Sequence, residues 1–535
     1  MNLQLSQPMG QRASEPELLV KRYRNMLQIS TVGDQPLLRE VHDYLLNELA
    51  YTRVEFVQPN RREQLMEAAM SGMLAGSDPY APFRPKPKIL QTRVHLCFSQ
   101  NGAIVTTIGM LTRLYTALRA RGLVARYVDL SPPRFRPNCY TVDIAAVRRN
   151  MPTIREDQWR CLDRMRNTDC GTIVAATGFG KSFLTQAICH MYPFAKIHYV
   201  VPQRDVAVKV VATLTASFAG VGRYGGGKQQ VGDRITVFTA GSIHHSDGDC
   251  DILLCDEVHE LMTDRYVKQI SETWLDARNY ALTATPDGRS DKNDHQIELC
   301  FGPQIFRMTY QEAVARNLVV PIRVRWIEMD FAVNPVAVSP GAMPMDSTSK
   351  MRLGVWRHKA RNRKIAEDVR LHYPDTTTQI LILCVTVDHA IHLWQELPEF
   401  SLCFGDRDME EIEPYIKNGM LPHNFQRVTS YVRESMRKKF ESAELSRVIA
   451  TDIWATGVDF RPLQVLYRVD ARASANKDAQ GPGRVSRLYA EGGKAYGEVI
   501  DCYDAWDDGF RGKSDKRRTS YRALGWEQGR RGVSR

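Results

Sequence analysis

The residues best suited to chemistry form one continuous stretch near the middle of the chain: Ala175, Ala176, Thr177, Gly178, Phe179, Gly180, Lys181 and Ser182. The stretch follows the apolar run 171–174 and precedes a helical pattern that begins at Phe183. In this setting glycines let backbone N–H groups surround phosphate oxygens, and the N-terminus of the helix favours negative charge. We expect Lys181 to reach the β- and γ-phosphates of ATP, and Ser182 to bind Mg²⁺ through its hydroxyl.

A pair of carboxylates, Asp256 and Glu257, follows the apolar run 251–255 and begins the sequence Asp-Glu-Val-His. A buried strand that ends in two carboxylates places them beside a phosphate loop in a parallel sheet. We assign Asp256 to Mg²⁺ and Glu257 to the orientation and deprotonation of an attacking water. An Asp-Glu pair alone is commonly just a solvated strand end, but the complete phosphate loop upstream favours the catalytic interpretation.

Three further motifs follow in order along the chain: Thr283-Ala284-Thr285-Pro286, Thr456-Gly457-Val458-Asp459 and Gln480-Gly481-Pro482-Gly483-Arg484-Val485-Ser486-Arg487. With the two motifs above, they span residues 155–487 and resemble the motifs of a superfamily-two helicase of the DEVH-box kind. Within that superfamily the sequence is similar to the phage UvsW and XPB branch. Ala175 replaces the first glycine of the general phosphate-loop pattern, and the helicase variant of that pattern has alanine there.

The resemblance implies roles for residues beyond the phosphate loop. Arg484 and Arg487 would act as arginine fingers from a second RecA-like domain, and Asp459 and Gln480 would contribute to the nucleotide site. An arginine finger contributes about 10³–10⁵ in rate. Gln158 precedes the phosphate loop at a distance that resembles the adenine-reading glutamine motif. An ordinary glutamine on a helix surface is an equally good interpretation of Gln158.

Several strand-end loops resemble the family's nucleic-acid contacts. They comprise Pro202, Gln203 and Arg204, then Thr239, Ala240, Gly241 and Ser242, and finally Thr456 and Gly457. In the family such loops hold the nucleic-acid backbone through main-chain N–H groups, small hydroxyls and an arginine. Contacts of this type bind phosphates and do not read the base sequence.

The predicted fold is α/β, with two RecA-like parallel-sheet motor domains and a smaller α+β N-terminal domain. The expected boundaries are an accessory domain at 1–148, motor domain 1 at 149–318, a linker or insertion at 319–350, motor domain 2 at 351–505 and a basic tail at 506–535. Within the accessory domain we expect residues 15–76 to form helices around one short strand, 52–57. Whether this domain grips DNA or only supports the architecture stays open at this point. The same holds for the tail, which either binds DNA or docks on the motor.

The composition is that of a globular protein with a polyanionic partner. The chain has 535 residues, a formal net charge of +11 and 11 scattered cysteines. At about 150 residues per domain, this length allows three domains. The absence of any CxxC pair argues against a zinc ribbon or a four-cysteine iron–sulfur cluster, and favours reduced thiols in the cytoplasm. No stretch of the sequence approaches a membrane span, so we expect a soluble protein. Its Arg-rich ending is similar to those of phage-encoded DNA helicases.

These observations together predict an ATP-dependent helicase or translocase that acts on single-stranded, forked or branched DNA in replication, recombination or repair. An RNA helicase with the same motor is one alternative, because no residue identifies a 2′-hydroxyl reader. A second alternative is a double-stranded DNA translocase that moves without strand separation in a restriction or remodelling assembly. A non-catalytic scaffold is disfavoured, because every catalytic position holds a chemically competent residue.

Overall fold

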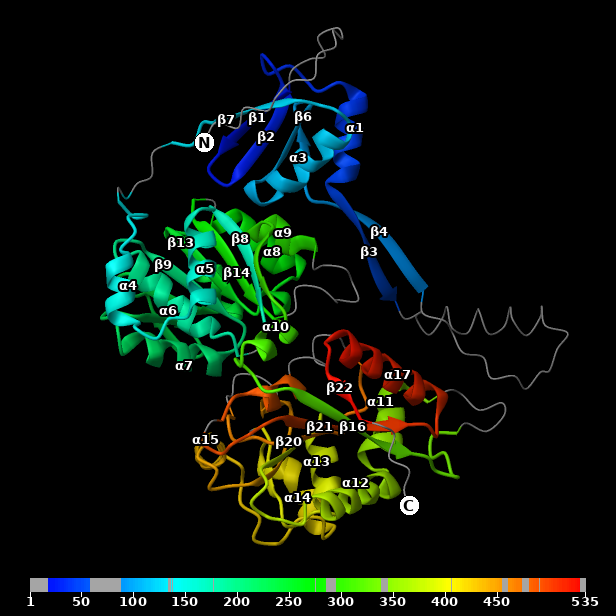
Figure 1. Ribbon diagram of the computed structural model, residues 1–535. Helices are drawn as coiled ribbons and strands as arrows, with labels where there is room; N and C mark the ends of the chain where they lie inside the picture. The colour runs from blue at the N-terminus through cyan, green and yellow to red at the C-terminus, as the bar shows by residue number, and fades with distance from the viewer. Residues whose placement is uncertain are drawn as a thin grey trace, which may run out of the picture. The chain divides into compact units, whose positions relative to one another are not determined.

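The computed structural model describes residues 18–57, 88–132, 136, 138–176, 178–274, 276–284, 295–337, 345–405, 407–454, 460–473, 481–489 and 491–529. The chain forms two compact units (Figure 1). One unit contains an N-terminal module and a first α/β domain, within residues up to Glu55, 90–174 and 182–307. The other unit is built mainly from residues 308–535, which form a second α/β domain.

The N-terminal module is a mixed sheet of five strands in the order β5-β6-β2-β1-β7. These strands are β1 (Leu18–Tyr23), β2 (Met26–Thr31), β5 (Phe98–Gln100), β6 (Ala103–Thr107) and β7 (Ala125–Asp129). Helices α1 (Arg39–Glu48) and α3 (Leu111–Ala120) pack their apolar residues into the module's core. Strands β3 (Ala50–Val57) and β4 (Lys88–His95) form a separate two-stranded sheet. The predicted α+β character of this region is therefore confirmed.

The prediction that residues 15–76 form helices around one short strand is wrong for their first part, because β1 and β2 are strands. Side chains alternate in burial along β1, where Leu18 and Val20 are buried and Leu19 and Lys21 are less so. Val20 lies opposite Ile29 of β2 in an antiparallel register. The two strands pair with each other. Strand β1 also pairs with β7 and β2 with β6, and β6 and β7 are distant in the sequence.

The module packs closely on the first α/β domain within the same unit. The buried side chain of Asn25 donates hydrogen bonds to the carbonyls of Trp274 and Ala277, at 3.1 and 2.7 Å. Gly109 lies so close to the domain that a Cβ atom there would be 2.2 Å from the carbonyl oxygen of Glu298. Because a side chain at position 109 would clash with backbone, the close approach requires glycine.

The first α/β domain contains an eight-stranded sheet in the order β11-β10-β12-β9-β13-β14-β8-β15. Its strands are β8 (Cys170–Ala175), β9 (Ile197–Val201), β10 (Gly222–Gly225), β11 (Lys228–Gln230), β12 (Ile235–Thr239), β13 (Ile252–Asp256), β14 (Arg278–Thr283) and β15 (Gln304–Met308). The strands from β10 to β8 in that order pair in parallel. Strands β9, β12 and β13 are buried along their whole length, as a sheet covered by helices on both faces requires.

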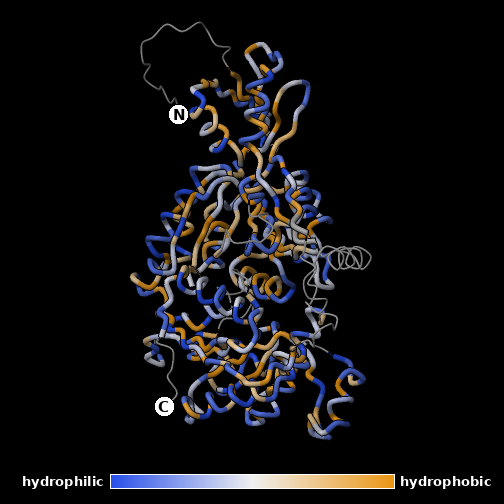
Figure 2. The backbone as a smooth tube through the Cα atoms, turned by 90° about the vertical axis from the view of Figure 1, so that its right-hand side faces the viewer, coloured by the Kyte–Doolittle hydropathy of each residue, from blue (hydrophilic) through white to orange (hydrophobic). Residues whose placement is uncertain are grey.

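The helices of this domain alternate with its strands, so that consecutive parallel strands are joined by crossover connections. They are α4 (Ile144–Asn150), α5 (Glu156–Arg166), α6 (Lys181–Met191), α7 (Arg204–Thr215), α8 (Asp264–Thr273) and α9 (His295–Phe301). Short 3₁₀ turns are η1 (Ile108–Met110) in the module, and η2 (Ala240–His245) and η3 (Val258–Glu260) after strands β12 and β13. Hydrophobic residues run along the sheet strands in the interior, whereas the loops are largely hydrophilic (Figure 2).

The second α/β domain contains a seven-stranded sheet in the order β18-β19-β17-β20-β21-β16-β22, and every pair in it is parallel. Its strands are β16 (Ile322–Met329), β17 (Ile380–Leu383), β18 (Ser401–Cys403), β19 (Arg447–Ala450), β20 (Val465–Arg468), β21 (Gly497–Asp504) and β22 (Glu527–Gln528). Its helical segments are α10 (Tyr310–Ala315), α11 (Ser347–Met351), η4 (Arg352–Trp356), α12 (Lys359–His372), α13 (Val387–Trp394), α14 (Met409–Lys417), α15 (Ser430–Glu441), η5 (Asp452–Trp454), η6 (Pro482–Ser486) and α17 (Asp508–Ala523). The predicted fold class, two RecA-like parallel-sheet domains with a smaller N-terminal α+β module, is thus confirmed.

Two segments that were expected to lie outside motor domain 2, the linker and the tail, form part of this second α/β domain. Strand β16, from the expected linker 319–350, lies between β21 and β22. In the tail, helix α17 docks on the domain, because its fully buried Arg517 donates to Asp501 from Nε to Oδ2 at 2.9 Å. Of the two roles considered for the tail, docking is what the structure shows for this helix.

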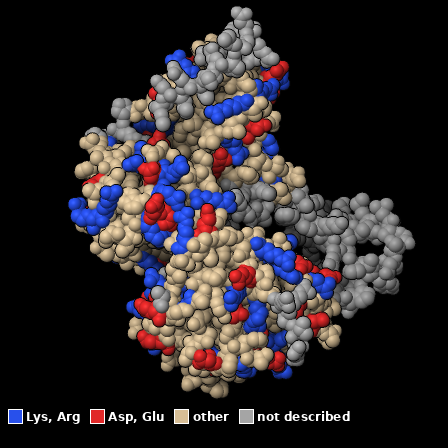
Figure 3. All heavy atoms as spheres, viewed as in Figure 1, with Lys and Arg blue, Asp and Glu red and all other residues tan. Residues whose placement is uncertain are grey.

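Charged residues of both signs are interspersed on the face of the molecule seen in Figure 3. The net charge of +11 is therefore not gathered into one basic patch on that face. Among the residues that the structure describes, no helix is both long and apolar enough to cross a membrane.

Candidate functional site

The predicted phosphate loop joins the buried strand β8 to helix α6. Gly178 and Gly180 have φ angles of +98° and +89°, a backbone region that favours glycine. Phe179 between them is fully buried, and its N–H donates to the carbonyl of Ala176 at 3.1 Å. Lys181 is the first residue of α6, and Ser182 follows it on the exposed side. The segment therefore has the strand–glycine turn–helix form that the sequence predicts, although Thr177 lies outside the described residues.

The carboxylate pair lies at the carboxyl end of β13, the second strand from β8 in the sheet. Asp256 is buried at 7% exposure, and its Oδ2 accepts a hydrogen bond of 3.0 Å from the hydroxyl of Tyr199. Its Oδ1 accepts from the backbone N–H of Glu257, also at 3.0 Å. Asp256 is thus held in one orientation by two donors. Because parallel strands end at the same edge of a sheet, this carboxylate and the phosphate loop share one edge.

Tyr199 is the residue of this site that the sequence analysis misses. It lies on β9, next to β13 in the sheet, and is fully buried. Burial, and then the charge of Asp256, raise the pKa of Tyr199 well above its ordinary value, so the phenol keeps its proton. It also interacts with Thr185 on α6, the helix that follows the phosphate loop. The available signal was a tyrosine in the buried strand Ile197–Val201, because a buried hydroxyl needs a partner.

Glu257 and His259 extend the site toward β14. Glu257 has a φ of +44°, a conformation uncommon for a residue with a side chain. His259 is buried. Its Nδ1 lies 2.9 Å from the Oγ1 of Thr283 and 3.6 Å from the Oε2 of Glu257. Thr283 ends β14 and begins the third motif, so a side-chain contact joins that motif to the Asp-Glu-Val-His sequence. Thr285 and Pro286 lie outside the described residues.

The other expected nucleotide contacts are only partly described. Gln158 is buried at 2% exposure on α5, and its Oε1 accepts from the backbone N–H of Arg155 at 3.1 Å. Gln158 therefore caps its own helix. This contact does not test whether Gln158 also binds adenine. Arg484 and Arg487 are half-buried in and directly after η6 of the second domain. Asp459 and Gln480 fall outside the part of the chain that the structure describes.

The expected nucleic-acid loops follow β9 and β12 in the first domain. Gln203 and Arg204 are exposed, at the start of α7, and Pro202 precedes them half-buried. Thr239 and Ser242 are buried, with their hydroxyls 3.0 Å apart.

These two hydroxyls therefore stabilise the loop itself, whereas Gly241 between them is exposed and Ala240 is buried. Thr456 and Gly457 of the second domain lie outside the described residues.

The residues assigned to Mg²⁺ fit that ion by their chemistry. A carboxylate and a hydroxyl are oxygen donors, and Mg²⁺ usually takes one or two protein ligands and fills its other positions with water and phosphate oxygens. A dedicated cage of three or more His, Cys, Asp or Glu side chains is absent from the described part of the chain.

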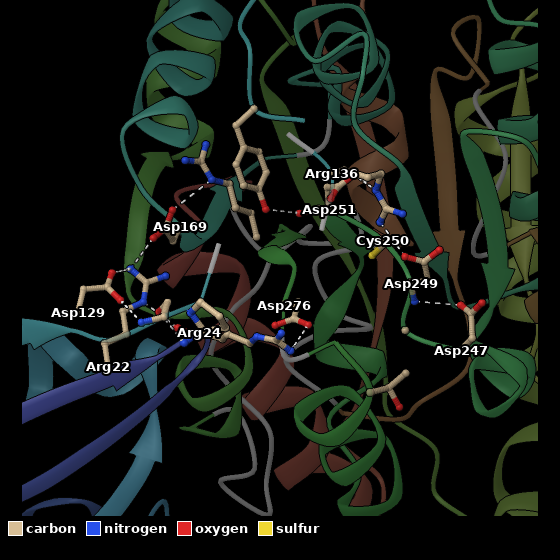
Figure 4. A pocket seen from close by; sticks show the side chains of 16 residues that line it. Arg22, Arg24, Asp129, Arg136, Asp169, Asp247, Asp249, Cys250, Asp251 and Asp276 are labelled. Atoms are coloured by element: carbon tan, nitrogen blue, oxygen red, sulfur yellow. Dashed lines mark hydrogen bonds and ion pairs between the residues drawn. The ribbon is translucent and has the colours of Figure 1, made fainter. Parts of the chain in front are cut away.

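A polar cavity of about 540 Å³ lies elsewhere, between the N-terminal module and the first α/β domain (Figure 4). Ion pairs cross it: Arg22 lies 2.7 Å from Asp169, and Arg136 lies 2.8 Å from Asp249 and 2.9 Å from Asp251. Asp169 and Asp251 precede β8 and β13, so the cavity is at the amino edge of the sheet, opposite the phosphate loop. Its arginines are committed to aspartates, and we interpret it as an ionic junction between module and domain.

Comparisons with known proteins agree with this picture of the motor. A family described as "Type III restriction enzyme, res subunit" matches residues 151–288, most of the first α/β domain. No curated protein matches the chain by sequence.

Among solved structures, the ATP-dependent type ISP restriction-modification enzyme LlaBIII bound to DNA has a TM-score of 0.50 and 13% identity, over 77% of this chain and 34% of LlaBIII. The chain thus spans about a third of LlaBIII, and the likeness shows a shared fold. Phage T4 UvsW (TM-score 0.39, 12% identity, 97% of this chain and 99% of UvsW) and S. cerevisiae Dbp5 bound to RNA and ADP BeF3 (TM-score 0.47, 12% identity, 73% and 94%) are weaker matches that carry no argument. The first α/β domain is thus similar to the res subunit of type III restriction enzymes, and the likeness to LlaBIII shows a shared fold.

Proposed function

We propose that this chain is an ATP-dependent DNA helicase or translocase that acts on forked or branched DNA. The observation that carries the proposal is the single sheet edge shared by the phosphate loop after β8 and the oriented carboxylate Asp256 at the end of β13. A phosphate cradle, a fixed metal ligand and an adjacent glutamate are the parts that ATP hydrolysis requires.

In the proposed reaction the phosphate loop and Lys181 hold the β- and γ-phosphates. Asp256 and Ser182 would hold Mg²⁺, which would supply positive charge opposite the charge that develops on the phosphate oxygens. Glu257 orients a water and accepts its proton as the water oxygen attacks the γ-phosphorus. The bond between the γ-phosphorus and the β–γ bridging oxygen breaks, which yields ADP and phosphate. Arg484 and Arg487 are proposed to stabilise the transferred group, and the loops after β9 and β12 to hold the DNA backbone.

The test is ATP turnover with and without single-stranded DNA, forked DNA, duplex DNA and RNA. Wild-type turnover should rise most with forked or single-stranded DNA, and Lys181→Ala should abolish it without loss of thermal stability. Lys268→Ala is the matched control, because its side chain is 73% exposed on α8 and should leave turnover unchanged. Near wild-type turnover in a folded Lys181→Ala protein would refute the nucleotide site. Stimulation by RNA alone would assign the motor to RNA.

The match to a restriction-enzyme family favours one second candidate, translocation on duplex DNA without strand separation. The two functions differ in a direct measurement. A duplex translocase displaces a third strand from a triplex while leaving the two duplex strands paired, whereas a helicase separates a forked duplex. Activity in the triplex assay with no unwinding of any fork would select the second candidate.

A further inference from the structure

One feature of the first α/β domain has no role in the proposed ATPase site: the hairpin of β10 and β11 at the end of the eight-stranded sheet. Gly225 pairs with Lys228, so the turn between the strands consists of Gly226 and Gly227. Both have positive φ angles, +62° and +85°, as in a type I′ turn. All of β11 is exposed. The hairpin therefore presents a solvent-facing edge strand.

The hairpin turn is packed tightly against both proposed nucleic-acid loops. A Cβ atom on Gly225 would lie 2.2 Å from Thr239 Oγ1, and one on Gly226 would lie 2.6 Å from Arg204 Cγ. Ser242 donates a 2.7 Å hydrogen bond from its hydroxyl to the carbonyl of Tyr224 on β10. These contacts fix the hairpin and the two loops as one surface, and glycine is required for so close an approach.

Aromatic rings run from the core of the domain to this surface. Tyr224 stacks on the buried Phe238 with ring centroids 5.8 Å apart, and the ring centroid of His245 lies 5.1 Å from that of Tyr224. His244 follows at 3.9 Å from His245. Both histidines are exposed on η2. The row thus ends in two solvent-facing imidazole rings that are supported by packed aromatic side chains.

The charged side chains of the hairpin turn and of η2 include no carboxylate. Arg204 and Lys228 are exposed, the segments 222–230 and 240–246 contain no aspartate or glutamate, and the exposed Asp205 follows Arg204 on α7. Cations placed beside flat rings bind single-stranded nucleic acid, because phosphates pair with the cations while bases stack on the rings. That combination distinguishes this surface from a basic helix face, which offers charge alone.

We propose that Arg204, Lys228, His244 and His245, here called the hairpin surface, bind one strand of a nucleic acid. Arg204 and Lys228 contact phosphodiester groups, and His244 stacks on a base. This inference rests on the proposed function and extends it, because it assigns a strand-binding role to Lys228, His244 and His245, which lie outside the helicase-like motifs, and joins them to Arg204. Phosphodiesters are common to DNA and RNA, so both polymers are probes of the same contact.

The test is fluorescence anisotropy with oligo-dT and oligo-U of equal length, across a series of salt concentrations. The triple variant Lys228→Ala, His244→Ala, His245→Ala should bind about tenfold to a hundredfold more weakly, with a shallower dependence on salt. His244→Phe should keep most of the wild-type affinity, because phenylalanine preserves the stacking ring. Lys268→Ala on α8 is the control and should bind like wild type.

Thermal melting establishes that each variant is folded, since the altered side chains are exposed. Affinity of the folded triple variant within twofold of wild type for both polymers would overturn the proposal. A loss for both polymers supports backbone contact, and a loss for one alone assigns the surface to that polymer. Failure of the wild-type protein to bind either strand would instead refute the proposed function, so the two failures are distinguishable.

Discussion

Tyr199→Phe removes a single hydroxyl group from the candidate site and changes nothing else in side-chain shape. The main interaction lost is the 3.0 Å hydrogen bond to Asp256 Oδ2, between side chains that are 0% and 7% exposed, and the interaction with Thr185 is lost with it. A buried hydrogen bond to a charged group contributes about 1.5–3 kcal/mol, and we expect the free energy of unfolding to fall by that amount.

The same substitution should also weaken the use of Mg²⁺. Loss of a group that orients a metal ligand typically costs about 10–100-fold in metal affinity or activity. We therefore expect the Mg²⁺ concentration at half-maximal ATP turnover to rise about tenfold or more in Tyr199→Phe, with turnover largely recovered at high Mg²⁺. The measurement is ATP turnover against free Mg²⁺ at saturating ATP.

Tyr280→Phe is the matched control for Tyr199→Phe. Tyr280 is a second buried tyrosine of the same sheet, on β14, and its hydroxyl donates only to the carbonyls of Met165 and Thr168, at 2.7 and 2.5 Å. This variant should lose stability but keep the wild-type Mg²⁺ dependence. If both variants have the same Mg²⁺ dependence, Tyr199 does not position a metal ligand and the assignment of Asp256 to Mg²⁺ loses its support.

Three further predictions concern catalysis and acid stability. Glu257→Gln should bind ATP normally and lower turnover by about 10²–10⁴-fold, because the amide keeps the shape and removes the base; normal turnover would place water activation elsewhere. Arg487→Ala should lower turnover about 10³-fold with little change in ATP affinity. Single-turnover kinetics and nucleotide binding measure the two quantities. Weaker ATP binding at unchanged turnover would contradict the finger role. His389 is fully buried, and burial followed by the charge of Arg361 lowers its pKa to about 3. The folded state therefore keeps His389 neutral, whereas in the unfolded state this histidine takes up a proton below its ordinary pKa of about 6.5. The contribution of His389 to stability is lost as pH falls from 6.5 toward 3, at about 1.4 kcal/mol per pH unit. Urea unfolding at pH 6.5 and 5 should show a smaller pH effect in His389→Leu than in the wild type, and equal effects would refute the assignment.

The sequence by itself determined the architecture of the two α/β domains and the local form of the phosphate loop. Apolar runs at 171–174 and 251–255 predict buried parallel strands, and both became strands, β8 and β13. The glycines at 178 and 180 adopt the positive φ angles that a phosphate loop needs. These features depend on local residue preferences and on short-range spacing, which a single sequence displays directly.

The tertiary structure alone decided which distant residues meet. Tyr199 and Asp256 are 57 positions apart and form a hydrogen bond because β9 and β13 are neighbours in the sheet. The order of strands in the sheet does not follow from the sequence of each strand. The same reason bears on β1 and β2, since besides each other they pair with β7 and β6, which lie far along the chain. It also explains Arg517 of the basic tail, for which the sequence left DNA binding and docking open, and which is buried against Asp501. Burying a charge is costly unless a partner is supplied, and only the folded sheet supplies that partner.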